Sequence, residues 1–200
     1  MELYMTMIRH IILALIIAML AGGGNVAQDS AFASLFQNVG SASPSETDPR
    51  PIEKNDFVVT DGESVIALDA PFAALDIGIE ENETGSNYVG EIFEGDLAYK
   101  IYSHEYADLI LFTSNLKYDQ KNREFDYYYI SQIALKTPAF HTGRGISIGS
   151  DVEDLIKKYG AGAQSALADA TMIEYSIDDW IIVFVAENDR IVGIILYVSP

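Results

Sequence analysis

Ser147, His104 and His141 are the residues whose types and positions could support nucleophilic catalysis in this chain. Residues 145–149, Gly-Ile-Ser-Ile-Gly, match the Gly-x-Ser-x-Gly pattern in which a tight strand–helix turn exposes a nucleophilic serine. That arrangement needs an acid and then a histidine further along the chain, and no histidine follows His141. We therefore expect Ser147 to fill a turn before a helix rather than to act as a nucleophile.

The other groups that could carry chemistry are isolated. His104 and His141 have no second histidine at the spacing of a metal site, and the chain has no cysteine for disulfides, thiolate zinc sites or thiol nucleophiles. Residues 80–83, Glu-Glu-Asn-Glu, lack the alternating acidic spacing of a twelve-residue calcium loop. The sequence therefore predicts no enzymatic activity, no cofactor and no metal site.

The net charge of the chain limits the classes of partner that it can bind. The chain carries 30 acidic and 12 basic residues, which gives a formal charge of −18. Fourteen of the acids and only two of the bases lie in residues 46–96. A nucleic-acid surface needs clustered Lys and Arg, so the sequence excludes one.

The first 27 residues have the layout of an export signal. A short polar start precedes an apolar run at residues 11–20, and small, helix-breaking residues follow up to Ala27. The run is about half the length that a spanning helix needs, so we expect no stable membrane insertion after cleavage. The absence of cysteine also excludes a lipid anchor on that residue. We expect a protein that is secreted or associated with the cell envelope.

The segment after the signal is rich in Ser, Pro and Asp. Three prolines in residues 44–51 oppose both helix and central strand, so we interpret residues 28–55 as a flexible acidic linker. Residues 31–39 could form a short helix within it, although the linker interpretation is favoured.

An internal repeat organises the remaining chain. Ile66, Leu68, Phe72 and Leu75 align with Ile146, Ile148, Val152 and Leu155 at a constant offset of 80 residues. Apolar runs at 109–112 and 133–135 match runs at 181–184 and 194–196 in the same order. The sequence therefore predicts two degenerate repeats, at residues 56–140 and 141–200.

Each repeat is expected to hold a helix followed by an antiparallel meander. Helices are expected at 69–79 and 150–159, where apolar residues of the second recur at helical spacing. Strands are expected at 97–103, 107–114, 127–137, 172–177, 180–186 and 191–198, with a further one at 88–93 and a tight hairpin at 187–190. The expected fold class is α+β, with helices packed on an antiparallel sheet.

Tyrosine is concentrated in the strands of the first repeat. Seven tyrosines lie between residues 99 and 129, and strand alternation places Tyr127 and Tyr129 on one face with Ile133 and Leu135, and Tyr128 on the other. Aromatic side chains dominate binding hot spots, although cross-strand aromatics also simply stabilise sheets. The candidate binding residues are Tyr102, Tyr106, Tyr128, Trp180 and Tyr197.

One motif in the second repeat resembles a known segment. Residues 142–160 contain Arg-Gly-Ile, then Ile-Gly, then a helix-length stretch that ends in Tyr-Gly; its marker residues are Arg144, Gly145, Ile146, Ile148, Gly149, Tyr159 and Gly160. The segment resembles one in secreted Gram-positive proteins of unknown function. Through it, residues 64–200 resemble β-lactamase inhibitory protein-like folds and small outer-membrane lipoproteins of the SmpA/OmlA type. The resemblance implies tandem units with a helical layer on an antiparallel sheet, and it does not imply inhibition of a β-lactamase.

These observations predict an exported, non-enzymatic module that binds a protein or peptide through aromatic side chains on an open sheet. Two alternatives remain open. One is a cell-envelope hydrolase whose site follows no motif, and the other is an acidic structural protein that binds cations or the cell wall.

Overall fold

The structure is a computed structural model that describes residues 49–74, 86–167 and 170–199. The expected signal at 1–27, the short helix at 31–39 and the acidic run at 80–83 lie outside the described residues, as do most of the expected linker and part of the helix expected at 69–79.

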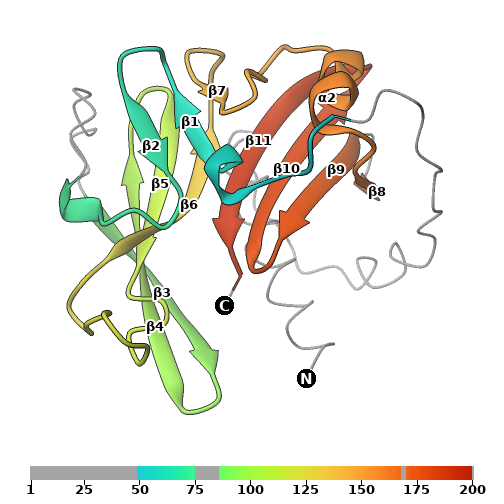
Figure 1. Cartoon of the computed structure of the whole chain (residues 1–200). Coiled ribbons are helices and arrows are strands. Elements are labelled where there is room, and N and C mark those ends of the chain that lie inside the picture. Colours follow the sequence, from blue (N-terminus) through green and yellow to red (C-terminus); the bar gives the residue numbers. More distant parts are fainter. Residues whose placement is uncertain (1–48, 75–85, 168–169, 200) are drawn as a thin grey trace.

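A large antiparallel sheet forms the body of the protein (Figure 1). Its strand order is β3-β4-β5-β6-β11-β10-β9-β8. The bounds are β3 (Ser86–Glu94), β4 (Leu97–Glu105), β5 (Leu109–Ser114), β6 (Tyr129–Leu135), β8 (Ala163–Leu167), β9 (Ala170–Ile177), β10 (Trp180–Glu187) and β11 (Arg190–Val198).

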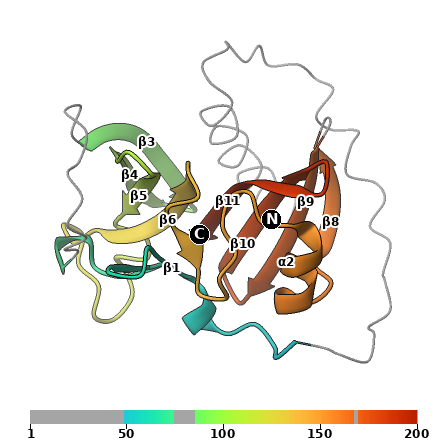
Figure 2. The ribbon, with the colours of Figure 1, turned by 90° about the horizontal axis from the view of Figure 1, so that it is seen from above.

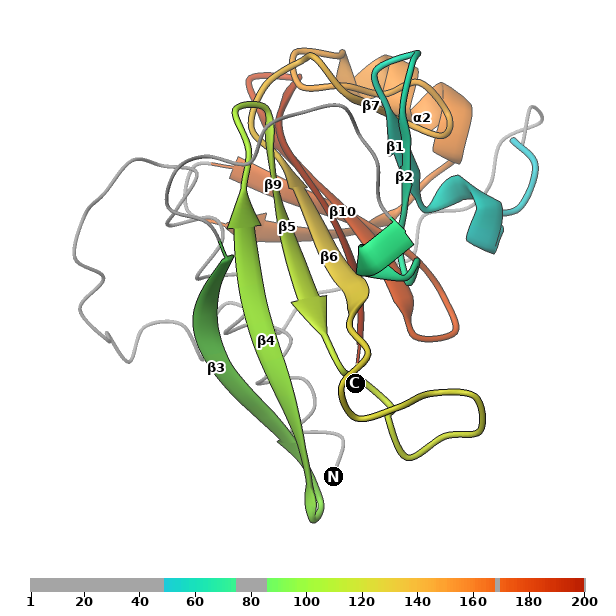
Figure 3. The same ribbon diagram turned by 90° about the vertical axis from the view of Figure 1, so that its left-hand side faces the viewer.

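Smaller elements lie together on one side of this sheet (Figure 2). They are the helix α2 (Val152–Tyr159), the 3₁₀ turns η2 (Lys54–Asp56) and η3 (Phe72–Ala74), and a second sheet of β2 (Val65–Ala67), β1 (Val58–Thr60) and β7 (His141–Thr142). Seen from the side, α2, β1 and β2 lie beyond the same face of the large sheet (Figure 3). Among the described residues no helix is both long and apolar enough to cross a membrane.

The expected α+β fold class, with helices packed on the sheet in each repeat, is wrong. The described chain is 53% strand and 9% helical, and α2 is its one α-helix. The start of the helix expected at 69–79 is instead bonded to β6 and to the residue before it. The Asp69 N–H donates to the Ile130 carbonyl, and the Phe72 N–H donates to the Tyr128 carbonyl. Backbone groups bonded to a neighbouring strand are not available for helical hydrogen bonds, and only the short turn η3 forms there.

Most of the expected strands and the second helix are confirmed. The strands β4, β5, β6, β9, β10 and β11 match their expected ranges to within three residues, and α2 falls within 150–159. The tight hairpin is also confirmed, because Asn188 and Asp189 both have positive φ, the conformation of a type I′ turn. The strands β1, β2, β7 and β8 were not expected.

The large sheet has two similar halves. β3-β4-β5-β6 and β8-β9-β10-β11 are each a four-stranded meander, and the last strands, β6 and β11, pair with each other in antiparallel fashion. Two copies of one unit would produce this order, and the duplication itself stays a prediction.

Two hydrophobic clusters lie on the two faces of the large sheet. The first is covered by α2 and the small sheet, and it includes Phe57, Ile66, Leu155, Phe184 and Leu196. The second contains side chains of β5, β6, β9, β10 and β11 that point the other way. Strand alternation separates the two: Ile182 and Phe184 belong to the first cluster, and Val183 and Val185 to the second.

Candidate binding surface

Three tyrosines form a row across the outer strands of the first half of the sheet. Tyr88 of β3 and Tyr102 of β4 are cross-strand partners, with ring centroids 5.5 Å apart. Tyr128, just before β6, packs edge-on against Tyr102 at 5.3 Å. Edge-to-face aromatic pairs at these distances are favourable, so the three rings support one another. We call Tyr88, Tyr102 and Tyr128 the tyrosine row.

The tyrosine row reaches the surface at the β3–β4 hairpin. Tyr88 is 57% exposed and Phe93, on the same strand, is 59% exposed. Phe125 and Tyr127, in the connection before β6, are also exposed. Exposed aromatic side chains are thus concentrated in this hairpin and the 115–128 connection, in the described part of the chain.

Two hydroxyls of the tyrosine row, those of Tyr88 and Tyr128, have a raised pKa. Burial raises the pKa of the Tyr88 hydroxyl, and the nearby Glu91 raises it further. Burial, together with Tyr102, also raises the pKa of Tyr128. A tyrosine hydroxyl is neutral at physiological pH even at its ordinary pKa of 10, so both groups can donate a hydrogen bond.

A second aromatic group supports the hairpin near its turn. Tyr118 packs between Tyr99, at 5.7 Å, and Phe125, at 5.0 Å. The Tyr99 hydroxyl donates to Glu94 at 3.1 Å, and the Lys100 ammonium lies 5.1 Å from the Phe125 ring. These contacts hold the 115–128 connection against the β3–β4 hairpin.

The hairpin is also acidic and lies at an edge. Glu91, Glu94 and Asp96 lie in or beside β3, and most side chains of β3 are exposed. β3 is the last strand in the sheet order, so no described strand pairs along its outer side. An edge strand presents backbone donors and acceptors to an incoming segment.

The five tyrosine and tryptophan candidates occupy different environments. Tyr102 and Tyr128 come together in the tyrosine row, both half-buried. Tyr106 and Tyr197 are buried, in the first and second cluster respectively. Trp180 is half-buried against Phe57, with ring centroids 5.5 Å apart. The structure therefore does not bring all five onto one surface.

The four exposed aromatics of this surface, Tyr88, Phe93, Phe125 and Tyr127, were not among the candidate residues. Tyr88 and Phe93 lie on β3, which the sequence suggested only as an additional strand. Phe125 lies in a connection, where strand alternation gives no orientation. One sequence signal could have found these aromatics: they lie close in the chain to the acidic residues of the hairpin.

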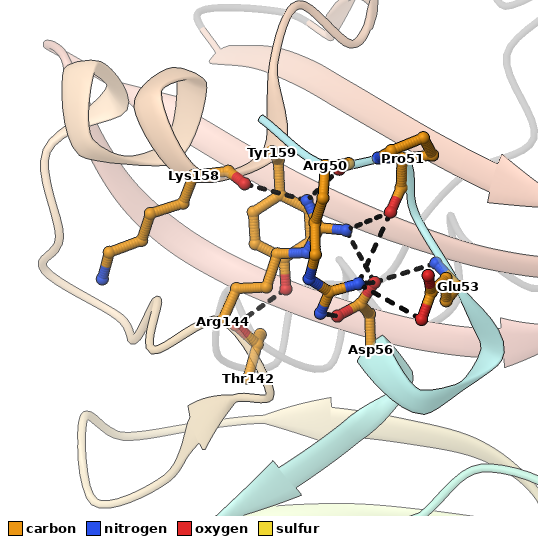
Figure 4. A network of polar contacts seen from close by, with 8 residues as sticks. All are labelled: Arg50, Pro51, Glu53, Asp56, Thr142, Arg144, Lys158 and Tyr159. Atoms are coloured by element: carbon orange, nitrogen blue, oxygen red, sulfur yellow. Dashed lines mark hydrogen bonds and ion pairs between the residues drawn. The ribbon is translucent and has the colours of Figure 1, made fainter. Parts of the chain in front are cut away.

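The motif residue Arg144 is the centre of a separate polar cluster (Figure 4). Its side chain is 6% exposed and lies over the Tyr159 ring, 4.8 Å from the centroid. One terminal nitrogen donates to the carbonyl oxygens of Lys158 (2.8 Å) and Arg50 (3.1 Å). The other donates to the Pro51 carbonyl (2.8 Å) and to the Asp56 carboxylate (2.7 Å).

This cluster joins the start of the described chain to α2. Asp56 is buried and accepts hydrogen bonds from Arg144, from Arg50 and from the Glu53 N–H. Burial opposes ionisation of this carboxyl, but the three donors outweigh it and hold its pKa below the ordinary value of 3.8. Because four protein oxygens already bond the two terminal nitrogens of Arg144, and its Nε is buried, we assign the cluster a structural role rather than anion binding.

The remaining motif residues shape the same region. Gly145 and Gly149 have φ of 72° and 88°, the left-handed region that glycine adopts at little cost. Ile146 is fully buried and Ile148 packs on the first cluster. Tyr159 donates to the Thr142 hydroxyl at 3.0 Å, and the N–H of Gly160 closes the helix by donating to the Ile156 carbonyl.

The serine and histidines considered for catalysis make other contacts. The Ser147 hydroxyl lies 3.4 Å from the Ser150 hydroxyl, in the turn before α2. His104 is buried in β4, where its ring contacts the Thr113 hydroxyl (3.0 Å) and the Phe72 ring. No group of three or more potential metal ligands occurs within the described residues.

A shallow pocket of about 390 Å³ adjoins the Arg144 cluster. It is lined by residues 49–52, 159–163 and 174–176. Its walls include Pro49, Gly160, Glu174 and Tyr175, and no histidine or pair of carboxylates faces into it. This lining offers no recognisable catalytic group.

Comparisons with protein-family models, with curated proteins and with solved structures gave no match.

Proposed function

We propose that this protein is a non-enzymatic module that binds a protein or peptide at the β3–β4 end of its large sheet. The observation that carries the proposal is the tyrosine row beside an exposed edge strand. Tyr88 and Phe93 present apolar area to water there, although burying such rings would be favourable. Aromatic side chains that are held in place by neighbours lose little entropy on binding.

The chemistry of the hairpin favours an extended, basic segment as the partner. A strand added along β3 would use the outer backbone groups of an edge strand, which is a common mode of peptide recognition. Glu91, Glu94 and Asp96 would attract Lys or Arg side chains of that segment. The tyrosine row would contact its apolar side chains.

The opposite edge of the sheet provides a comparison within the same molecule. β8 is also an edge strand, but its residues Ala163–Leu167 include neither an aromatic nor a charged side chain. The two edges therefore differ in the groups that recognise a partner, which supports β3 as the binding edge.

The setting of this function is the cell envelope or the outside of the cell, on the basis of the signal expected at residues 1–27. A surface that binds other proteins fits such a location, where secreted proteins and peptides are available as partners.

Selection from a random peptide phage library against the immobilised chain from residue 28 tests this proposal. We expect selected peptides to be rich in Lys, Arg and strand-forming residues, and Tyr102→Ser to weaken their binding at least about tenfold. The matched control is Val65→Ser, at an exposed apolar side chain of β2. Equal binding to both variants, with unchanged thermal midpoints, would contradict the proposal.

A further inference from the structure

The second hydrophobic cluster defines an apolar face that the described elements leave without a covering layer. Nine buried side chains form it, and none of them is charged: Ile110, Phe112, Ala134, Met172, Ile181, Val183, Val185, Ile195 and Tyr197. We call this set the back face. The partly buried hydrophobic residues packed against it, Ile101, Leu167 and Ala170, all lie in strands of the same sheet.

The two faces of the sheet therefore differ. The first cluster lies under α2, η2 and the small sheet, whereas among described residues no helix or second sheet lies over the back face (Figure 3). All nine side chains are nonetheless at most 8% exposed, and exposing them to water would cost about 25 cal/mol for each Å². A single-layer sheet with apolar residues on both faces needs a cover on both.

We propose that residues 31–39 of this chain dock on the back face as a short amphipathic helix. Their sequence is Ala-Phe-Ala-Ser-Leu-Phe-Gln-Asn-Val. The large apolar residues fall at i, i+3, i+4 and i+7, which places them on one side of a helix: Phe32, Leu35, Phe36 and Val39. Ser34, Gln37 and Asn38 fall on the opposite side, which would face water.

The ends of the segment also fit a helix. Asp29 and Ser30 precede it and are good N-cap residues, and Gly40 follows it, where glycine favours helix termination. None of the nine residues is charged, in a chain whose formal charge is −18. The segment and the back face are thus both apolar and uncharged.

The path of the chain allows this docking. Residues 40–48 separate the segment from Pro49, and nine residues span up to about 30 Å when extended. Pro49 lies beside Gly160 and lines the same pocket as Ala163 of β8. β8 is the edge strand at that end of the sheet, so a chain that docked on the back face would pass around this edge.

The other apolar segment of the chain fits the back face less well. Residues 11–20 are apolar on every side, so a helix made of them would still expose apolar surface after docking. They also belong to the expected signal and would leave the exported protein. Residues 31–39 remain, and they have one apolar and one polar side.

Charge substitutions in the chain from residue 28 test the proposal. We expect the double variant Leu35→Asp/Phe36→Asp to lower the thermal midpoint by about 5–10 °C and to increase binding of an apolar fluorescent dye several-fold. The control Ser34→Asp/Gln37→Asp adds the same charge on the water-facing side. It should change neither the thermal midpoint nor the dye binding. Equal effects of the two double variants would overturn the proposal.

Because the chain has no cysteine, introduced cysteines give a second measurement that does not depend on stability. We expect Phe36→Cys to form a disulfide with Ile195→Cys within one molecule, and Gln37→Cys to form much less with the same partner. Absence of a preference would contradict the docking. A disulfide between two molecules would identify a second copy as the cover and would also overturn the proposal.

Discussion

At the scale of single residues, Arg144 of the 142–160 motif joins the 50–56 segment to the end of α2. Its two terminal nitrogens bond four oxygens from the 50–56 segment and the end of α2. Only a planar guanidinium presents donors in this fixed geometry, because a lysine ammonium acts as a single point charge. Without those donors, the carboxylate of Asp56 would be buried with fewer partners.

We therefore expect Arg144→Lys to lower the free energy of unfolding by about 2–4 kcal/mol, since a buried carboxylate would lose much of its compensation. Urea denaturation measures this change. Arg190→Lys is the control, because Arg190 is exposed and its pair with Asp151, at 3.2 Å, is a surface contact worth less than about 1 kcal/mol. Equal losses in the two variants would contradict the role given to Arg144.

The pKa of Asp56 gives a pH-dependent prediction. Because this pKa is lower in the folded protein than the ordinary 3.8, the ionised carboxylate stabilises the fold above that pH. The stabilisation is lost as the pH falls through the folded value. We expect Asp56→Asn to be less stable than the parent at pH 7, and the difference to shrink below about pH 3.8, as followed by urea midpoints. A difference that stays constant from pH 7 to pH 2 would disprove this.

At the scale of elements, the two turns that flank α2 need glycine for different reasons. Gly149 has φ of 88° and open space where a Cβ would be. Gly162 differs, because a Cβ there would meet the Glu174 carbonyl at 2.9 Å and the Ile173 and Tyr175 side chains at 2.8 Å. Gly149 is therefore needed for its positive φ, and Gly162 is needed because no side chain fits there.

This contrast predicts different responses to substitution. Gly149→Ala should cost about 1–2 kcal/mol, and Gly149→Asn should cost less, because asparagine tolerates positive φ better than alanine. At Gly162 both substitutions should be destabilising, and asparagine should be the worse because it is larger. Thermal midpoints of the four variants give the comparison, and a benefit of asparagine at Gly162 would refute the steric explanation.

Strand alternation failed locally at β6. The register shifts between Phe112 and Thr113, where Gln132 and Ile130 are their partners, so Ser131 is the extra residue of a bulge. Ile130 and Ile133 consequently both belong to the first cluster, although they are three residues apart. The expected placement of Ile133 and Leu135 on one face is confirmed. Residues before the bulge, however, point to the face opposite to the one that simple alternation predicts.

At the scale of the whole molecule, the two halves of the sheet share one core. The first cluster joins Leu109 and Ile133 of the first half to Phe184 and Leu196 of the second. β6 and β11 pair in register from Leu135–Ile194 to Gln132–Tyr197. Neither half buries its apolar residues without the other.

We therefore expect a single unfolding transition. Urea curves followed by far-UV circular dichroism, which reports both halves, should coincide with curves followed by Trp180, the single tryptophan, which lies in the second half. Leu196→Ala should shift both curves by the same 2–5 kcal/mol, while Val192→Ala, at an exposed side chain of the same strand, should leave them unchanged. Separate midpoints would show that the halves fold independently.

Sequence reasoning located most strands because period-two alternation and turn residues are local signals. The run Ile181–Val185 and the Asn188–Asp189 turn are examples. It missed β1, β2, β7 and β8, whose two- to five-residue lengths leave little periodicity to detect. Of the residues of the proposed binding surface, the sequence pattern indicated Tyr102 and Tyr128, and it also indicated Tyr106 and Tyr197, which are buried.

The sequence by itself determined the composition of this protein and its local structure: an acidic chain without cysteine, strands at regular intervals, glycine turns and the helix after Gly149. These depend on residues close together in the chain. The tertiary structure decided which tyrosines meet, that residues 69–72 bond to β6 instead of forming a helix, and that Arg144 binds Asp56. Those outcomes depend on pairings between segments up to 88 residues apart, which local periodicity does not encode.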